Sequence, residues 1–304
     1  MITVENLTKR YGKKTATEQL SFTVPSGQVT GFLGPNGSGK STTMRCMVGL
    51  DSPTQGRALI KGVHYSQLDS PLTTVGALLD AKAFHPARTA KQHLTVVAET
   101  HGFPRSRVSE ILDMTGLSGV ADKKVKGFSL GMGQRLGIAT AMMGNPEYLL
   151  LDEPVNGLDP DGVRWVRDLV KNHARIGGTV LISSHLMSEM AMTATNLVVI
   201  GNGRLIASGP IKQFTESAGH TTVRVSGPDL GAIGEALSQL QPRLERTENG
   251  DVLLIQGRTS AEVGHALHVA GLEIHELTTL HSSLEDVFLE LTGQAVEFRA
   301  GGNR

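Results

Sequence analysis

The chain has 304 residues, which is enough for one large domain and a smaller one. Lysine plus arginine and aspartate plus glutamate both number 29, so the formal net charge is zero and a general attraction to nucleic acid or acidic lipid is not expected. The single cysteine, Cys46, excludes a disulfide framework, and because the chain shows neither a signal peptide nor an apolar run of roughly 20 residues, any role at a membrane requires another polypeptide.

The N-terminal part of the chain alternates between strand-like and helix-like patterns. Short apolar runs bounded by turn residues predict strands, and apolar residues recur at helical spacing from residue 89 to about 144. The strands are expected at 2–4, 20–24, 29–33, 58–60, 148–151, 179–183 and 197–200, and an amphipathic helix at 162–176. This alternation predicts an α/β fold whose ligands bind at the carboxyl ends of the strands.

A change in composition near residues 217–219 separates a C-terminal segment with its own pattern. Within it, Asn249-Gly250 is a strong hairpin-turn signal between two short strands. The expected elements are strands at 221–226, 243–248, 252–256 and 273–278, and helices at 230–240, 261–269 and near 284–291. The order β-α-β-β-α-β resembles a small ferredoxin-like unit, so we predict two domains, residues 1–217 and 220–304.

The segment Gly34-Pro35-Asn36-Gly37-Ser38-Gly39-Lys40-Ser41 matches the phosphate-binding loop pattern G-x-x-x-x-G-K-[ST]. Its glycines allow successive backbone N–H groups to point at one phosphate, while Lys40 supplies a positive charge near the β and γ phosphates. The hydroxyl of Ser41 can ligate Mg²⁺, and a helix predicted at 42–50 turns its positive end toward the same anion. Because a strand-like run precedes the motif and a helix follows it, the context favours nucleotide binding over a merely structural turn.

Two adjacent carboxylates, Asp152 and Glu153, follow the apolar run at 148–151. Unpaired acidic side chains at the end of a buried strand are costly, so a cationic partner is expected there. Asp152 suits the Mg²⁺ shell of a phosphate-loop enzyme, and Glu153 could polarise the attacking water. The alternative is that both carboxylates only cap the following helix.

Further motifs follow the phosphate loop in a diagnostic order. They are Ser129-Leu130-Gly131-Met132-Gly133-Gln134-Arg135, the strand ending in Asp152-Glu153-Pro154, Asn156-Gly157-Leu158-Asp159 and Ser184-His185. Together they resemble the ATP-binding subunit of an ABC transporter over residues 1–217, in the group that serves drug- and antibiotic-export permeases made as separate chains. Ser283-Leu284-Glu285-Asp286-Val287-Phe288 looks like part of the accessory domain found in that group. The resemblance implies a phosphate-loop ATPase with a RecA-like core, a β-rich subdomain, a helical subdomain at about 86–145 and a small α+β domain after it.

The resemblance also implies roles for single residues. Glu153 would be the general base, His185 the switch histidine that contacts the γ-phosphate, and Asp159 would lie in a loop that crosses between subunits. Tyr11 matches the aromatic residue that stacks on adenine, although the ring taken alone could equally serve ordinary packing. The residues implied to hold the phosphates and Mg²⁺ of ATP are Asn36, Gly37, Ser38, Gly39, Lys40, Ser41 and Thr42, with Asp152 as a further metal ligand.

Ser129 and Gly131 match the signature motif, which in this family caps the γ-phosphate held by the opposite subunit. A serine hydroxyl and the N-terminal amides of the following helix suit an anion, although Ser129 could instead serve only as the N-cap of its own helix. The resemblance therefore implies a dimer of two copies with ATP and Mg²⁺ at shared sites. It also implies a membrane permease as partner, no nucleic acid, and a cytoplasmic location on the inner face of the cell membrane.

Two features depart from the family pattern. Leu130 and Met132 replace a glycine and a glutamine of the signature, so the packing there is expected to change. The glutamine that would sense Mg²⁺ is missing, and aligning residues 75–80 with the usual segment puts Asp80 in its place. Because a carboxylate can ligate Mg²⁺ directly or through water, Asp80 is a candidate metal ligand.

The function that follows is ATP hydrolysis coupled to a separate permease, an exporter of drug-like or hydrophobic compounds, which would dock where the segment near Asp80 meets the region 86–145. An alternative is a soluble ATPase of the same superfamily that acts on DNA or ribosomes. Against it, the chain has no long coiled-coil insertion, no tandem cassette and no net charge. An unrelated phosphate-loop kinase or GTPase would leave the motifs at 129–135 and 184–185 unexplained.

Overall fold

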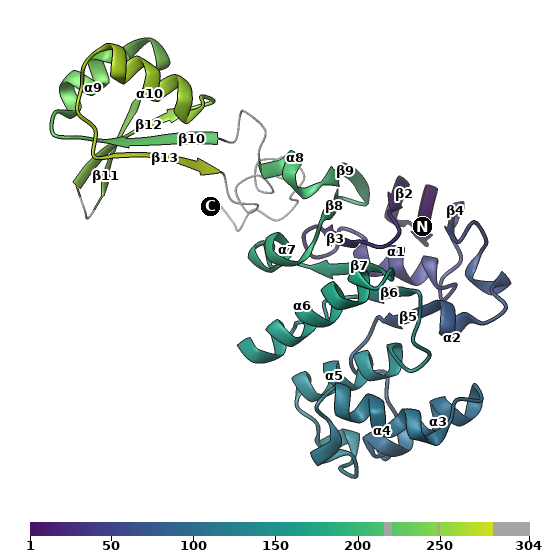
Figure 1. Ribbon diagram of the computed structural model, residues 1–304. Coiled ribbons are helices and arrows are strands. Elements are labelled where there is room, and N and C mark those ends of the chain that lie inside the picture. Colours follow the sequence, from purple (N-terminus) through teal and green to yellow (C-terminus); the bar gives the residue numbers. More distant parts are fainter. Residues whose placement is uncertain (216–220, 248–249, 282–304) are drawn as a thin grey trace, which may run out of the picture. The chain divides into compact units, whose positions relative to one another are not determined.

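The computed structural model describes residues 1–215, 221–247 and 250–281 of the chain (Figure 1). These residues divide between Gly209 and Pro210 into two compact units. Each unit has a hydrophobic core of its own, one that includes Phe32 and one that includes Val223. The sequence pattern predicts the division slightly later, near residues 217–219, which lie outside the described ranges.

An antiparallel sheet of order β2-β1-β4 forms the β-rich part of the first unit. Apolar and polar residues alternate along its strands, so Ile2 and Val4 of β1 are buried while their neighbours are more exposed. Leu20, Phe22 and Val24 of β2 follow the same pattern. The strands run Ile2–Tyr11 for β1, Lys14–Val24 for β2 and Gln55–Ile60 for β4.

A second sheet, of order β5-β6-β7-β3-β8-β9, forms the α/β part. Strands β5, β6, β7, β3 and β8 pair in parallel, and β3, β6 and β7 are buried along their whole length, as is typical of parallel strands covered on both faces. Parallel pairing brings the carboxyl ends of these three strands to one edge, where the loops after them meet. The strands run Val29–Leu33 for β3, Val75–Leu78 for β5, Tyr148–Leu151 for β6, Thr179–Ser184 for β7, Asn196–Gly201 for β8 and Arg204–Pro210 for β9.

Helix α1, Lys40–Met47, packs into a core that both sheets share. Its Met44 belongs to the same buried cluster as Phe22 and Phe32, whose ring centroids lie 5.4 Å apart. Burying a side chain of this size contributes roughly 1.5–3 kcal/mol, so packing from both sheets holds α1 in place. The other helices around the sheets are α2 Pro71–Thr74, α6 Pro160–Arg175 and α7 Met187–Thr193, with a 3₁₀ turn at Tyr65–Gln67. No helix in the described ranges is both long and apolar enough to cross a membrane.

Helices α3, α4 and α5 pack on one another at one end of the first unit, next to β5 (Figure 1). Thr89 caps α3 by accepting from the backbone N–H of Gln92, and Ser129 caps α5 by accepting from that of Met132. The helices run Ala90–Thr100, Arg105–Met114 and Leu130–Ala141, with 3₁₀ turns at Ser118–Val120 and Val125–Gly127. They fall within the helical region that the sequence predicts.

The second unit begins with the short helix α8, Ile211–Thr215, and continues as β-α-β-β-α-β. Its sheet has the order β11-β12-β10-β13, and neighbouring strands are antiparallel. Val223 and Ile255 of the sheet pack with Ile233 of α9 and Leu267 of α10 in one core. This is the ferredoxin-like order expected from the sequence. The elements run β10 Thr221–Ser226, α9 Leu230–Ala236, a 3₁₀ turn Ser238–Leu240, β11 Arg243–Thr247, β12 Gly250–Gln256, α10 Ser260–Val269 and β13 Glu276–His281.

Four predicted features of the C-terminal segment fall partly or wholly outside the described residues, among them the end of the strand expected at 243–248. Asn249 of the hairpin signal lies in the gap at 248–249. The predicted helix near 284–291 and the motif Ser283-Leu284-Glu285-Asp286-Val287-Phe288 lie in the gap at 282–304. They stay predictions.

Because each unit has its own core, a chain that ends at residue 217 is expected to fold without the C-terminal unit. It should unfold in one cooperative transition and bind ATP as tightly as the full chain does. Calorimetry would measure the first property and titration with a fluorescent ATP analogue the second. A folded truncation that has lost ATP binding would contradict the division into two domains.

Candidate nucleotide site

The loop between β3 and α1 carries the phosphate-loop motif and lies close to β2. Gly39 precedes α1 with φ at +103°, a left-handed conformation that residues with side chains rarely adopt. A Cβ atom there would lie 2.6 Å from the carbonyl oxygen of Ala16, so only glycine fits. Helix α1 therefore begins directly after the turn, and its first-turn N–H groups, which have no partner within the helix, are available to an anion.

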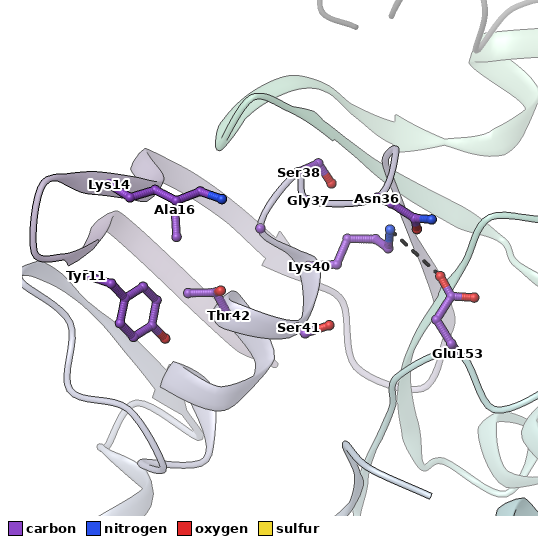
Figure 2. A pocket seen from close by; sticks show the side chains of 11 residues that line it. Tyr11, Lys14, Ala16, Asn36, Gly37, Ser38, Lys40, Ser41, Thr42 and Glu153 are labelled. Atoms are coloured by element: carbon purple, nitrogen blue, oxygen red, sulfur yellow. Dashed lines mark ion pairs between the residues drawn. The ribbon is translucent and has the colours of Figure 1, made fainter. Parts of the chain in front are cut away.

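Lys40 is almost fully buried, with 6% of its surface exposed. Its Nζ donates to the carbonyl oxygen of Gly34 at 2.6 Å and to that of Pro35 at 3.4 Å, and it lies 3.8 Å from Oε1 of Glu153 (Figure 2). Burial lowers the pKa of Lys40, and the carboxylates of Glu153 and Asp152 partly offset this effect. The loop's own carbonyl groups thus hold the lysine beside the acidic pair.

Hydrogen bonds from two other elements hold the side chain of Asp152 and the backbone of Glu153. The N–H of Glu153 donates to Oγ of Ser183 at 2.8 Å, and that hydroxyl donates to Oδ1 of Asp152 at 2.5 Å. From α5, Nε2 of Gln134 donates to the carbonyl oxygen of Glu153 at 3.1 Å. Glu153 has φ at +49°, which is uncommon for a residue other than glycine. The backbone of this residue is therefore held on both sides.

His185 follows β7 and lies beside the same carboxylate. Its Nδ1 is 2.8 Å from Oε2 of Glu153, and half of its side chain is exposed. Since Oε1 of Glu153 faces Lys40, the two carboxylate oxygens have different partners. Lys40, Glu153 and His185, which follow β3, β6 and β7 in the chain, thus meet at the carboxylate of Glu153.

A pocket of about 310 Å³ lies beside these groups, with Tyr11 at one end and Glu153 at the other (Figure 2). Oη of Tyr11 donates to Oδ2 of Asp51 at 2.6 Å, and this hydrogen bond raises the pKa of the tyrosine. The ammonium group of Lys9 lies 4.8 Å from the centroid of the Tyr11 ring. The pocket is lined by Tyr11, Lys14, Ala16, Asn36, Gly37, Ser38, Gly39, Lys40, Ser41, Thr42 and Glu153.

The groups around this pocket suit a magnesium nucleotide. An aromatic ring at one end, a glycine-rich backbone and the ammonium group of Lys40 match a base followed by a chain of phosphates. Oγ of Ser38 is buried and has no hydrogen-bond partner within the described part of the chain, so the loop offers a further polar group. Ser41 and Asp152 have the hydroxyl and carboxylate oxygens that Mg²⁺ prefers.

Comparisons with known proteins match both parts of the chain. A family profile described as ABC transporter matches residues 17–156, and one described as a domain of unknown function matches residues 221–285. The chain is 34% identical to a Bacillus subtilis protein called "uncharacterized ABC transporter ATP-binding protein YhcH", over 98% of this chain and 97% of YhcH. This chain belongs to the ATP-binding proteins of ABC transporters.

Two further relatives agree with this family. The bacitracin transport ATP-binding protein BcrA of Bacillus licheniformis is 32% identical, over 96% of this chain and 97% of BcrA. The dimeric structure of MJ0796, a bacterial ABC transporter cassette, superposes with a TM-score of 0.63 at 25% identity, over 69% of this chain and 99% of that one. The protein is therefore an ATPase of the ABC type, which binds ATP and Mg²⁺.

The signature residues of this ABC ATPase are not brought to its own nucleotide pocket. Among the described residues, those that line the pocket do not include Ser129, Gly131 or Asp159. Oγ of Ser129 accepts from the N–H of Met132 at 3.2 Å, and Oδ1 of Asp159 accepts from the N–H of Gly162 at 2.8 Å. Both side chains are exposed N-caps, one of α5 and one of α6.

Leu130, which replaces a signature glycine, has a packing partner in the same chain. Gly157 has φ at +74°, and a Cβ atom on it would collide with the side chain of Leu130. The leucine nevertheless remains 48% exposed. The replacement therefore fills space that a glycine at 157 leaves, and it connects the signature to the loop at 156–159.

Asp80 follows β5 and lies in a separate groove. Its Oδ1 accepts from the backbone N–H of Lys82 at 2.8 Å, and the residue is exposed. It lines a groove of about 470 Å³ together with Arg45 and Phe84, rather than the pocket beside Lys40. Its role as a metal ligand stays a prediction.

Three side chains around the site are not predicted from the sequence. Gln134 and Ser183 hold the backbone of Glu153, and Asp51 holds the ring of Tyr11. A signal was available for Ser183, because a serine in a fully buried strand needs a hydrogen-bond partner. The contact between Tyr11 and Asp51 joins residues 40 positions apart, for which a single sequence carries no signal.

Replacing Lys40 with methionine removes the ammonium group and keeps most of the bulk. We expect the dissociation constant for ATP to rise by about ten- to a hundredfold, since a hydrogen bond to a charged group contributes about 1.5–3 kcal/mol. Isothermal titration calorimetry with ATP would measure the change. Lys14→Met is the matched control, because this second lysine also lines the pocket and should have a smaller effect. Unchanged ATP affinity in Lys40→Met would count against phosphate binding at this loop.

Proposed function

We propose that this chain is the ATP-hydrolysing subunit that drives a separate drug-export permease. The observation that carries the proposal is that Lys40 and His185 both lie beside the carboxylate of Glu153 at one end of the pocket, with Asp152 directly before it in the chain. A protein that only binds nucleotide needs the loop and its lysine. The acidic pair and the histidine add the groups that hydrolysis requires.

In this proposal the pocket holds ATP along its length. Tyr11 would stack on the adenine, while the phosphates would lie on the backbone of the loop, with Lys40 beside the β and γ phosphates. Ser41 and Asp152 would hold Mg²⁺, whose positive charge would stabilise the negative charge that develops on the phosphates. The position of Tyr11 and Glu153 at opposite ends of one pocket supports this orientation.

Glu153 is proposed as the general base that accepts a proton from the attacking water. Its carboxylate lies between Lys40 and His185, and the hydrogen bond to Nδ1 of His185 leaves Nε2 of that ring available to the γ-phosphate. His185 would therefore orient the base and contact the nucleotide at the same time.

A second copy of the chain is proposed to complete each site. Ser129 and Gly131 would cap the γ-phosphate held by the partner, and Asp159 would lie at the same interface. ATP is then a shared ligand, so its binding closes the dimer and its hydrolysis allows the two copies to separate. The exposure of Ser129 and the dimeric structure of MJ0796 support this arrangement.

The groove that contains Asp80 is proposed as the docking site of the permease. It lies between the end of α1 and the helices α3 and α5, and its lining is largely apolar, including Val48, Leu79 and Phe84. Leu50 at this groove is 60% exposed. An exposed aliphatic side chain at a concave apolar surface suits an inserted protein segment.

We propose export of a drug-like or hydrophobic compound, because BcrA, whose name describes bacitracin transport, aligns with 96% of this chain. Selectivity for the compound would lie in the permease. Through that partner the chain would be held at the cytoplasmic face of the cell membrane.

Glu153→Gln removes the proposed base and keeps the shape of the side chain. We expect hydrolysis to fall by at least about a hundredfold, while ATP binding persists, because a general base contributes roughly 10²–10⁴-fold. The trapped ATP should stabilise a dimer, which size-exclusion chromatography with light scattering would detect. A variant that hydrolyses ATP at the parental rate would refute the assignment of the base.

Leu50→Glu places a charge in the proposed docking groove. We expect loss of co-purification with the permease, because a buried, unpaired carboxylate is costly, while ATPase activity of the isolated subunit is retained. Ile176→Glu is the matched control, since Ile176 is also an exposed aliphatic residue, at 71%, and does not line this groove. Equal retention of the permease by both variants would argue against this docking site.

A further inference from the structure

The backbone of Glu153 is held in an uncommon conformation by side chains from α5 and β7. A left-handed φ of +49° is unfavourable for a glutamate and persists only where the surroundings fix it. Here the N–H of Glu153 donates to Ser183, and the carbonyl oxygen of the same residue accepts from Gln134. These two hydrogen bonds hold the N–H and the carbonyl group of Glu153 in place.

Stability alone does not explain the amide at position 134. Gln134 is 5% exposed, and its Oε1 has no hydrogen-bond partner among the described residues. An unpaired buried acceptor costs free energy that one donated hydrogen bond does not fully offset. An apolar side chain of similar size would fill the same space without that cost. The amide is therefore retained for the hydrogen bond that it donates to Glu153.

We infer that Gln134 and Ser183 are positioning residues for ATP hydrolysis, which keep Glu153 in the conformation that turns its carboxylate into the nucleotide pocket. Neither residue is among those that line the pocket, so both act through Glu153. The inference rests on the proposed role of Glu153 as the general base. Ser183 also donates to Asp152, so the base and a proposed metal ligand share one support.

Helix α5 thereby has a second role. The helix begins at Ser129, an exposed N-cap, and reaches the backbone of Glu153 through the buried side chain of Gln134. A shift of α5 relative to the parallel sheet would lengthen or break this hydrogen bond. The helical region therefore acts directly on the conformation of the base.

The test uses the full chain with Gln134→Met, a replacement of similar length that cannot donate. We expect single-turnover ATP hydrolysis to slow by about ten- to a hundredfold, because small displacements of a catalytic group have effects of this size. ATP affinity should stay within about twofold. The thermal midpoint should change little, since removal of the unpaired amide oxygen offsets the loss of the donor to the carbonyl oxygen of Glu153.

Arg135→Met is the matched control on the same helix. Nη1 of Arg135 donates to the carbonyl oxygen of Thr115 at 3.0 Å, and its guanidinium lies 4.7 Å from the centroid of the Trp165 ring, whereas no bond joins it to Glu153. This variant removes a polar side chain of the same helix and leaves the hydrogen bond from Gln134 to Glu153 in place. Its hydrolysis rate should stay within about twofold of the parental rate.

Ser183→Ala is an independent second variant, which tests the inference even if Gln134→Met does not fold. It should also slow hydrolysis, and the loss in the double variant should be smaller than the product of the single losses, because both act on one backbone conformation. Parental rates in both single variants would overturn the inference. Losses of rate that follow equal losses of thermal stability or ATP affinity would overturn it too, because they indicate a merely structural role.

Measuring Glu153→Gln beside these variants distinguishes the role of Glu153 as the base from the positioning role of Gln134 and Ser183. A parental rate in Glu153→Gln refutes the base itself. An inactive Glu153→Gln together with a fully active Gln134→Met refutes only the positioning role.

Discussion

The site depends on the parallel pairing of β6, β7 and β3. Strands that run in the same direction end at the same edge of a sheet, so loops far apart in the chain emerge side by side. Lys40 lies after β3, Glu153 after β6 and His185 after β7, and their side chains meet at that edge. Because these strands are buried along their whole length, the edge cannot shift without disturbing the core.

Packing in the hydrophobic core also holds the helix that follows the phosphate loop. Met44 of α1 packs with Phe22 of the antiparallel sheet and Phe32 of the parallel sheet, so the helix that follows the loop is held from two directions. The left-handed turn at Gly39 then fixes where that helix begins. A polar site that must bind a flexible, highly charged molecule is thus built on elements whose positions are set by apolar packing.

Much of this arrangement could be predicted from the sequence because its signals are local. The sequence alone shows the fully apolar runs, the residues directly after each run and the phosphate-loop pattern. The order of the expected elements was enough to predict the ferredoxin-like unit. Strand β5 is not predicted, since it is short and contains Gly76, which weakens a strand pattern. Helix α7, Met187–Thr193, is shorter than the window in which helical periodicity can be recognised. The support that Gln134 gives Glu153 joins distant parts of the chain and follows only from the packing of α5.

The left-handed backbone of Glu153 makes glutamate an unfavourable residue for stability at this position. For residues other than glycine, and to a lesser degree asparagine and aspartate, that geometry costs roughly 1–2 kcal/mol, a noticeable share of the 5–15 kcal/mol by which a typical domain is stable. A sequence optimised for folding alone would place glycine at this position. With Glu153 as the proposed general base, glutamate at this position is a trade-off that favours turnover over stability, and efforts to raise the heat tolerance of this subunit should leave the position unchanged.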